Sequence, residues 1–128
     1  MKITISGEDT IAVRLAEALM HEHEVTMIIP KSIENPVFDT LNVQTFRGSQ
    51  TSSKLLKEAC IFDADLFVAC GKADETNLVA CAEAKRMRAK KVVCFLRGQA
   101  VQTNENDAAQ LAKTLGIDKV ILPALRLA

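Results

Sequence analysis

Short runs of β-branched and other apolar residues alternate along the chain with segments of helical periodicity, and this alternation limits the possible folds more than any other feature. The apolar runs lie at residues 2–6, 24–29, 43–46, 66–70, 91–96 and 119–122. Helical patterns lie at residues 10–21, 52–59, 75–88 and 106–115, while Pro30 and Pro36 leave only a short or irregular helix between residues 30 and 40. Strands that alternate with helices form parallel sheets with both faces covered. The pattern therefore predicts an α/β fold, a doubly wound parallel sheet of about six strands in a single domain.

The charge balance gives no general reason to expect an anionic partner. The 128 residues include 16 Lys and Arg against 16 Asp and Glu, so the net charge does not favour nucleic acid or an anionic membrane surface. Residues 85–91 carry five cations, but they lie at the C-terminal end of a predicted helix, where cations are favourable. The chain has neither Trp nor Tyr to stack on bases. We therefore expect no nucleic-acid partner.

The lengths of the apolar runs also indicate where in the cell the protein is located. The longest of them have the length of a strand and are far short of the roughly 20 residues of a membrane-spanning helix. The first residues enter a strand pattern at once, without the apolar core of a signal peptide. Cys60, Cys70, Cys81 and Cys94 form no C-x-x-C pair, which favours reduced thiols. The sequence thus predicts a cytoplasmic protein with no direct insertion into the membrane.

No constellation of residues indicates catalysis or metal binding. His21 and His23 are two residues apart, so on a helix their side chains point to different sides, and no third ligand is near. No Ser or Cys has a His and an Asp in a known catalytic spacing. We therefore expect no catalytic residue and no metal site, and the chain is not predicted to be an enzyme.

A ligand site is predicted from the fold class alone. In doubly wound sheets a ligand lies beyond the carboxyl ends of the strands, where the strand order reverses. In this sequence the ends of the first and fourth strands lead into residues 7–10 and 70–74. These two loops are the candidate site.

The run from Asp65 to Lys85, and above all its segment from Asp74 to Cys81 (DETNLVAC), resembles the signature of the RCK domain family, also called KTN or TrkA-N. The resemblance extends over nearly the whole chain, from the glycine loop at Gly7 to the end at Pro123. It implies a Rossmann-like fold that binds NAD(H) or an adenine nucleotide such as ATP or ADP. It also implies a regulatory subunit of a Trk or Ktr potassium uptake system, which controls a membrane potassium transporter and reaches the inner face of the membrane through that partner. The family-equivalent cofactor positions are Gly7, Glu8, Asp9, Thr10, Ile11, Ile29, Gly48, Ser49, Gly71, Lys72 and Arg97.

Three of these positions depart from the family pattern. Asp9 stands where a side-chain-free residue would let the backbone approach a pyrophosphate. Ile29 stands at the end of the second strand, where an acidic residue would accept hydrogen bonds from the ribose. Ser49 replaces the aspartate that commonly follows the third strand. We therefore expect nucleotide binding to be weakened or lost, and no cofactor is assigned.

Two arrangements of the loop remain open. In the first, Asp9 or Thr10 caps the first helix from within, and the site takes no ligand. In the second, Thr10, Gly48, Gly71, Lys72 and Arg97 serve an altered nucleotide or anion mode. A different class of function, a small NAD(P)-binding oxidoreductase or epimerase, would need a second substrate region and a catalytic Tyr, Lys or His in the cleft.

The end of the chain suggests both a continuation and an interface. Residues 120–127 stay apolar where a free domain end would turn polar. We therefore expect residues 1–128 to be the N-terminal part of a longer protein. Together with Phe38 and Phe62 on predicted connections, this segment favours a homo-oligomer, either a dimer or a larger ring. The alternative is that the two phenylalanines cover the core of the same chain.

Overall fold

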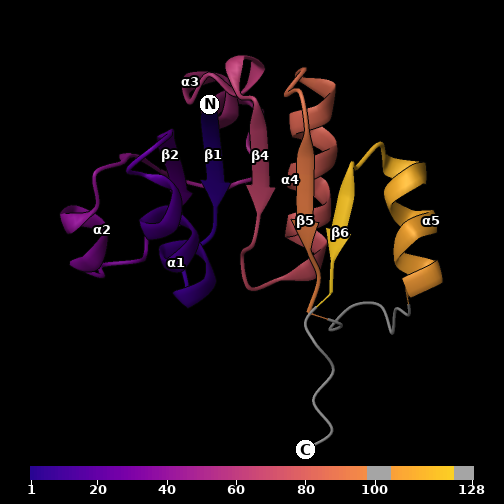
Figure 1. Cartoon of the computed structure of the whole chain (residues 1–128), viewed down its shortest axis with the longest axis horizontal. Helices are drawn as coiled ribbons and strands as arrows, with labels where there is room; N and C mark the ends of the chain where they lie inside the picture. Colours follow the sequence, from indigo (N-terminus) through magenta and orange to yellow (C-terminus); the bar gives the residue numbers. More distant parts are fainter. Residues whose placement is uncertain (98–104, 123–128) are drawn as a thin grey trace, which may run out of the picture.

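The computed structural model describes residues 1–97 and 105–122, which form one sheet of six parallel strands flanked by helices (Figure 1). The strands are β1 (Lys2–Ser6), β2 (Glu24–Ile29), β3 (Gln44–Arg47), β4 (Leu66–Ala69), β5 (Val92–Phe95) and β6 (Lys119–Ile121). The helices are α1 (Thr10–Leu19), α2 (Val37–Thr40), α3 (Ser53–Glu58), the 3-10 turn η1 (Ile61–Asp63), α4 (Asp74–Arg86) and α5 (Glu105–Leu115). The strand order is β3-β2-β1-β4-β5-β6. This is the doubly wound sheet that the sequence predicts, and α2 is short, as the two prolines indicate.

The core consists of two layers, one on each face of the sheet. On one face, α1 and α2 cover buried side chains of β1 and β2 through Ala12, Ala16 and Phe38. On the other face, α3, α4 and α5 cover β4 and β5, and the small residues Ala80, Cys81 and Ala84 bring α4 close to the strands. Small residues on a helix stripe permit this close packing.

The register of the strands brings their carboxyl ends to one level. Ser6 at the end of β1 pairs with Ile28 in β2 and with Ala69 in β4. Ala69 in turn pairs with Cys94 in β5. The loops that follow β1, β2, β4 and β5 therefore leave the sheet at the same edge, which is where the sequence places the candidate site.

Phe38 corrects one interpretation of the sequence. Its side chain is 2% exposed and belongs to the core under α1 and α2, so it offers nothing to a partner. Phe62 on η1 is 57% exposed. In the apolar segment 120–127, residues 123–127 lie outside the described residues.

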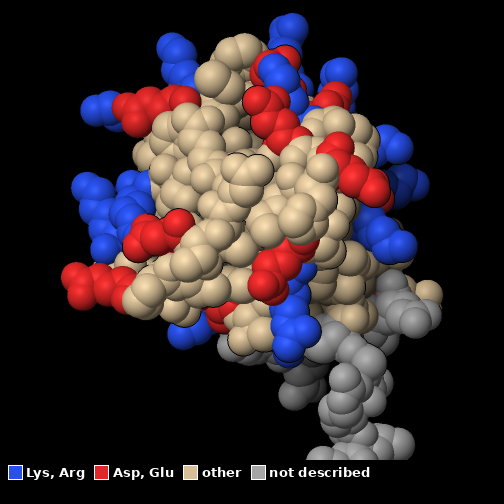
Figure 2. Space-filling view, turned by 60° about the vertical axis from the view of Figure 1, so that its left-hand side comes forward, with Lys and Arg blue, Asp and Glu red and all other residues tan. Residues whose placement is uncertain are grey.

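The surface agrees with the charge balance. On the face in Figure 2, acidic and basic side chains are interspersed around the edge, and neither sign forms a continuous field. Within the described ranges, no helix is both long and apolar enough to cross a membrane.

Candidate functional site

A cleft of about 610 Å³ opens over the carboxyl ends of four neighbouring strands. Its size falls in the range of small-molecule sites. The lining residues come from the loop after β1, the end of β2 and its turn, the loop after β3, and the loop from β4 into α4. They are Ser6, Gly7, Glu8, Ile28, Pro30, Lys31, Gly48, Ser49, Gln50, Lys72, Ala73 and Thr76.

Gly7 permits the close approach of the loops after β1 and β4. A Cβ atom at this position would lie 2.9 Å from the carbonyl oxygen of Cys70 and 3.1 Å from Cβ of Ala12. Both distances are too short for an ordinary contact, so a side chain would push the loop away from β4 or from α1. Gly7 is therefore needed for close packing of this loop against β4 and α1.

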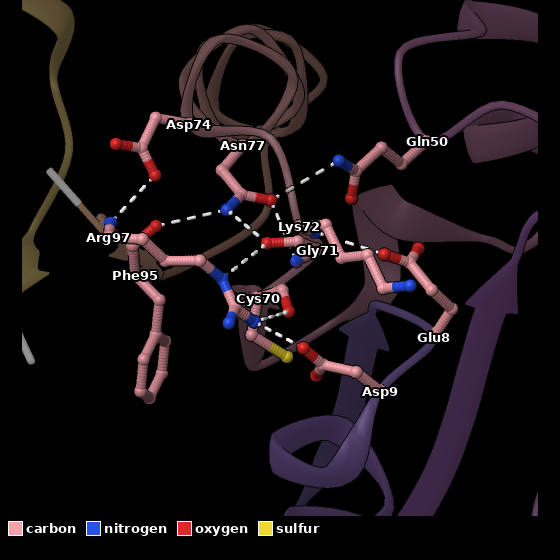
Figure 3. A network of polar contacts seen from close by, with 10 residues as sticks. All are labelled: Glu8, Asp9, Gln50, Cys70, Gly71, Lys72, Asp74, Asn77, Phe95 and Arg97. Carbon is pink, nitrogen blue, oxygen red and sulfur yellow. Dashed lines mark hydrogen bonds and ion pairs between the residues drawn. The ribbon is translucent and has the colours of Figure 1, made fainter. Parts of the chain in front are cut away.

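The first turn of α1 contains the main difference from the sequence interpretation. Asp9 is the N-cap residue of α1, yet its side chain accepts no hydrogen bond from the helix. Its Oδ2 instead lies 2.6 Å from Nη2 of Arg97, which directly follows β5 (Figure 3). The predicted capping by Asp9 is therefore wrong, because an arginine from the far side of β4 binds this carboxylate.

The ion pair between Asp9 and Arg97 is largely buried. Only 22% of the Asp9 side chain and 27% of the Arg97 side chain are exposed. Arg97 Nε also donates to the carbonyl of Gly71 at 3.3 Å. The second oxygen of Asp9, Oδ1, is buried and has no hydrogen-bond partner among the described residues. The pair thus links the loop after β1, the loop after β4 and the end of β5.

Asn77 on α4 forms the centre of a second network. Its side chain is fully buried. Its Oδ1 accepts from the backbone N–H of Gly71 at 2.8 Å and from Nε2 of Gln50 at 3.2 Å. Its Nδ2 donates to the carbonyls of Gly71 and Phe95 at 2.9 and 3.0 Å. One amide therefore satisfies backbone groups at the ends of both β4 and β5.

Three further contacts complete this edge of the sheet. The carboxylate of Asp74, which is 1% exposed, accepts from the backbone N–H of Arg97 at 2.7 Å. Glu8 Oε1 accepts from the backbone N–H of Lys72 at 3.0 Å. The hydroxyl of Ser6 donates to Oε1 of Gln50. The polar groups of the loops are thus bonded mostly to one another.

The family-equivalent positions fall into three groups in the structure. Gly7, Glu8, Gly48, Ser49 and Lys72 line the cleft, while Asp9, Gly71 and Arg97 form the networks beside it. Thr10 is exposed at the start of α1, and Ile11 packs partly buried against the core. Ile29 is fully buried among core side chains and does not line the cleft. At the end of β2 the cleft is lined by Ile28, Pro30 and Lys31.

Sequence reasoning did not single out Asn77, Gln50 or Lys31. A signal for Asn77 is nevertheless present, because Ala80, Cys81 and Ala84 follow it at helical spacing and are small, apolar and buried. A lone amide on such a stripe must find partners within the core.

The cysteine at the end of β4 has no nucleophilic character. Burial raises the pKa of the Cys70 thiol to about 12, and the nearby Asp9 carboxylate acts in the same direction. Nucleophilic cysteines react as thiolates, so this thiol is inert at neutral pH. Across residues 1–97 and 105–122, no group of three or more His, Cys, Asp or Glu side chains is placed to hold a metal ion.

The fold and its cleft define a Rossmann-like domain, the class in which nucleotides commonly bind at this edge of the sheet. The family model of the TrkA-N domain matches residues 3–123, and the chain belongs to this family. The Trk system potassium uptake protein TrkA of Halomonas elongata is 37% identical over 115 residues, which cover 84% of this chain and 25% of that protein. The TrkA homologue of Archaeoglobus fulgidus is 32% identical over 131 residues, which cover 100% and 29%. The chain thus spans between a quarter and a third of the length of these two relatives.

Solved structures agree on the fold. The NAD(P)-binding domain of an exopolyphosphatase-related protein from Archaeoglobus fulgidus superposes with a TM-score of 0.76 at 12% identity, over 95% of this chain and 87% of that one. The TrkA-N domain of the inner membrane protein ybaL from Escherichia coli gives a TM-score of 0.75 at 13% identity, over 94% and 86%. The GsuK channel gives 0.73 at 15% identity, over 94% of this chain and 21% of that one.

Proposed function

We propose that this chain is a regulatory domain of a Trk-type potassium uptake system and that it acts on a membrane potassium transporter. The observation that carries the proposal is the TrkA-N match over residues 3–123, together with relatives that are named as Trk potassium uptake proteins. The domain would work in the cytoplasm, as a homo-oligomer, and would reach the inner face of the membrane through the transporter. It has no catalytic role.

Potassium uptake by the source cells tests this role. Disruption of the gene is expected to lower the initial rate of rubidium uptake at low external potassium, and the intact gene is expected to restore it. As a control, a gene that carries Lys57→Gln, a substitution at an exposed position on α3, should restore uptake to the same rate as the intact gene. Unchanged uptake in the disrupted strain would contradict the proposal.

The second part of the proposal is that the dinucleotide position is closed by the protein's own residues. A pyrophosphate normally sits at the N-terminus of the first helix of such folds. Here the Asp9 carboxylate lies in that loop and is paired with Arg97. An unpaired carboxylate about 5 Å from a phosphate charge would repel it by about 1–3 kcal/mol at effective dielectric constants of about 80 to 20, so an entering pyrophosphate meets either this repulsion or the cost of breaking the Asp9–Arg97 pair. This lowers affinity by about one to two orders of magnitude.

Calorimetric titration with NADH, NAD, ATP and ADP tests the closed site. We expect dissociation constants of about 100 µM or weaker for each of them. In Asp9→Gly the affinity for these nucleotides should rise, because the change frees Arg97 and removes the negative charge. A dissociation constant of about 10 µM or below for the unaltered chain would refute this part of the proposal.

A further inference from the structure

The two ends of the cleft differ in charge. Its lining contains three charged residues, Glu8, Lys31 and Lys72. Glu8 and Lys72 belong to one end, because the backbone N–H of Lys72 donates to the Glu8 carboxylate and the two side chains leave from neighbouring loops (Figure 3). Lys31 belongs to the other end, beyond β2. The end at β1 and β4 therefore carries a carboxylate beside its lysine, whereas the end at β2 carries a cation alone.

Hydrogen bonds to neighbouring backbone groups fix the turn that contains Lys31. It lies in a turn in which the N–H of Ile33 donates to the carbonyl of Pro30 at 3.2 Å. A guanidinium nitrogen of Arg47, the last residue of β3, donates to the carbonyl of Ile33 at 2.5 Å. The Lys31 side chain is exposed and forms no ion pair with any described residue. The backbone of Lys31 is thus fixed at the cleft wall, and its ammonium group is free to pair with an anion in the cleft.

The usual position of a nucleoside in this fold predicts which of its phosphate isomers the charges at the two ends of the cleft favour. The 5′ side of the ribose faces the loop after the first strand, and the secondary hydroxyls lie over the end of the second strand. A 5′-phosphate would therefore approach Glu8 and Asp9. A phosphate on a secondary hydroxyl would approach Lys31, since cationic residues at this point accept ribose phosphates in folds of this class. Ile29, buried in the core, offers no carboxylate against it.

We propose that the cleft binds a nucleoside phosphomonoester whose phosphate is on the 2′ or 3′ hydroxyl of the ribose, with Lys31 as the residue that selects it. This ligand class rests on the proposed function and deepens it, because it takes the cleft beside the closed dinucleotide position as the site at which the regulatory domain binds its ligand. A phosphomonoester of this kind needs no space at the Asp9–Arg97 pair, which lies outside the lining of the cleft. Ile28 and Pro30 supply the apolar wall against which the sugar packs.

The test compares adenosine and its isomeric monophosphates as probes. The whole chain is titrated with adenosine 2′-monophosphate, adenosine 3′-monophosphate, adenosine 5′-monophosphate, adenosine and inorganic phosphate. At least one of the 2′ and 3′ isomers is expected to bind about tenfold or more tightly than the 5′ isomer and adenosine, which corresponds to about 1.4 kcal/mol. Inorganic phosphate alone should bind more weakly than that isomer.

Variants test whether Lys31 causes the preference for a phosphate on the 2′ or 3′ hydroxyl. Lys31→Gln should remove the preference for the secondary phosphate, while Lys57→Gln on α3 should keep it. Glu8→Gln should raise the affinity for the 5′ isomer more than for the others. Both Lys31 and Lys57 are exposed, so neither change endangers the fold, and circular dichroism checks this directly.

Three results would overturn the inference. They are equal or tighter binding of the 5′ isomer, an unchanged preference in Lys31→Gln, and no binding of the 2′ or 3′ isomer at about 5 mM. None of them touches the role in potassium uptake, which the rubidium experiment measures separately. Unchanged rubidium uptake in the disrupted strain, together with an intact preference for the secondary phosphate, would instead remove the proposed function and leave the ligand preference.

Discussion

Replacing Asn77 with aspartate tests whether the buried amide holds the edge of the sheet together. The change keeps the size of the side chain and its two acceptor contacts, with Gly71 N and Gln50 Nε2. It removes the donors to the carbonyls of Gly71 and Phe95. Each lost bond costs about 0.5–1.5 kcal/mol, and a carbonyl left unsatisfied in the interior costs about 1–3 kcal/mol. Gly71 O keeps Arg97 as a second donor at 3.3 Å, whereas Phe95 O keeps only the weak thiol donor of Cys94 at 3.8 Å, so the larger loss falls on Phe95.

The variant should therefore lose about 3–5 kcal/mol of its free energy of unfolding at pH 7, with burial of the carboxylate included. Burial beside two carbonyls raises the pKa of the new carboxyl above its unfolded value of about 3.9. The folded variant then holds a proton that the unfolded chain releases. Stability relative to the unaltered chain should fall by about 1.4 kcal/mol per pH unit as the pH rises from about 4 to the raised pKa.

Urea unfolding at a series of pH values between about 4 and 8 measures this deficit. Asn77→Ala should be destabilised to a similar extent but without the pH dependence, because it introduces no titrating group. Asn42→Asp, at an exposed position, should stay within about 0.5 kcal/mol of the unaltered chain. An Asn77→Asp variant as stable as this control, or a deficit that does not change with pH, would refute the role given to the amide.

Three further predictions concern other contacts. A double-mutant cycle of Asp9→Ala and Arg97→Ala should give a coupling energy of about 1–2 kcal/mol, because the pair is about three-quarters buried; a value under about 0.3 kcal/mol would remove the ion pair from the account. Hydrogen bonds from Arg86 and from Ser53 lower the pKa of Glu83 from 4.5 to about 2. Glu83→Gln should therefore destabilise the protein by about 0.5–1.5 kcal/mol above about pH 5, and urea unfolding should show this deficit vanish as the pH falls from 4.5 to about 2. Sedimentation velocity between about 10 and 500 µM should show a dimer or larger species, and a single species near 14.0 kDa throughout would contradict self-association.

The sequence predicted the sheet well because local patterns determine it. Apolar runs and helical stripes gave every strand and long helix to within one or two residues, and the alternation of the two gave the doubly wound order. The edge of the cleft followed from the same reasoning, since Gly7 and Lys72 both line it. These features depend on periodicity and on general rules of chain connection.

The site chemistry depended on contacts that a single sequence does not reveal. Asp9 and Arg97 are 88 residues apart and meet only because β1, β4 and β5 are neighbours in the sheet, so local reasoning assigned Asp9 to its own helix. Ile29 was counted as a cofactor position, but its side chain turns into the core under α1. Phe38 was assigned to an interface for a similar reason, because its segment offered no periodicity from which burial could be judged.

In the pair with Arg97, the Asp9 carboxylate competes with any free anion for the guanidinium group. A group tethered beside its partner acts at an effective concentration of about 1 mM or more. A free anion at about 0.1 mM, with the same intrinsic affinity for the guanidinium, would then displace the carboxylate in only about one molecule in ten. At about 0.1 mM of such an anion, Arg97 thus stays paired with Asp9 in most molecules. Replacement of Asp9 by an uncharged residue would leave the guanidinium open to the same anion.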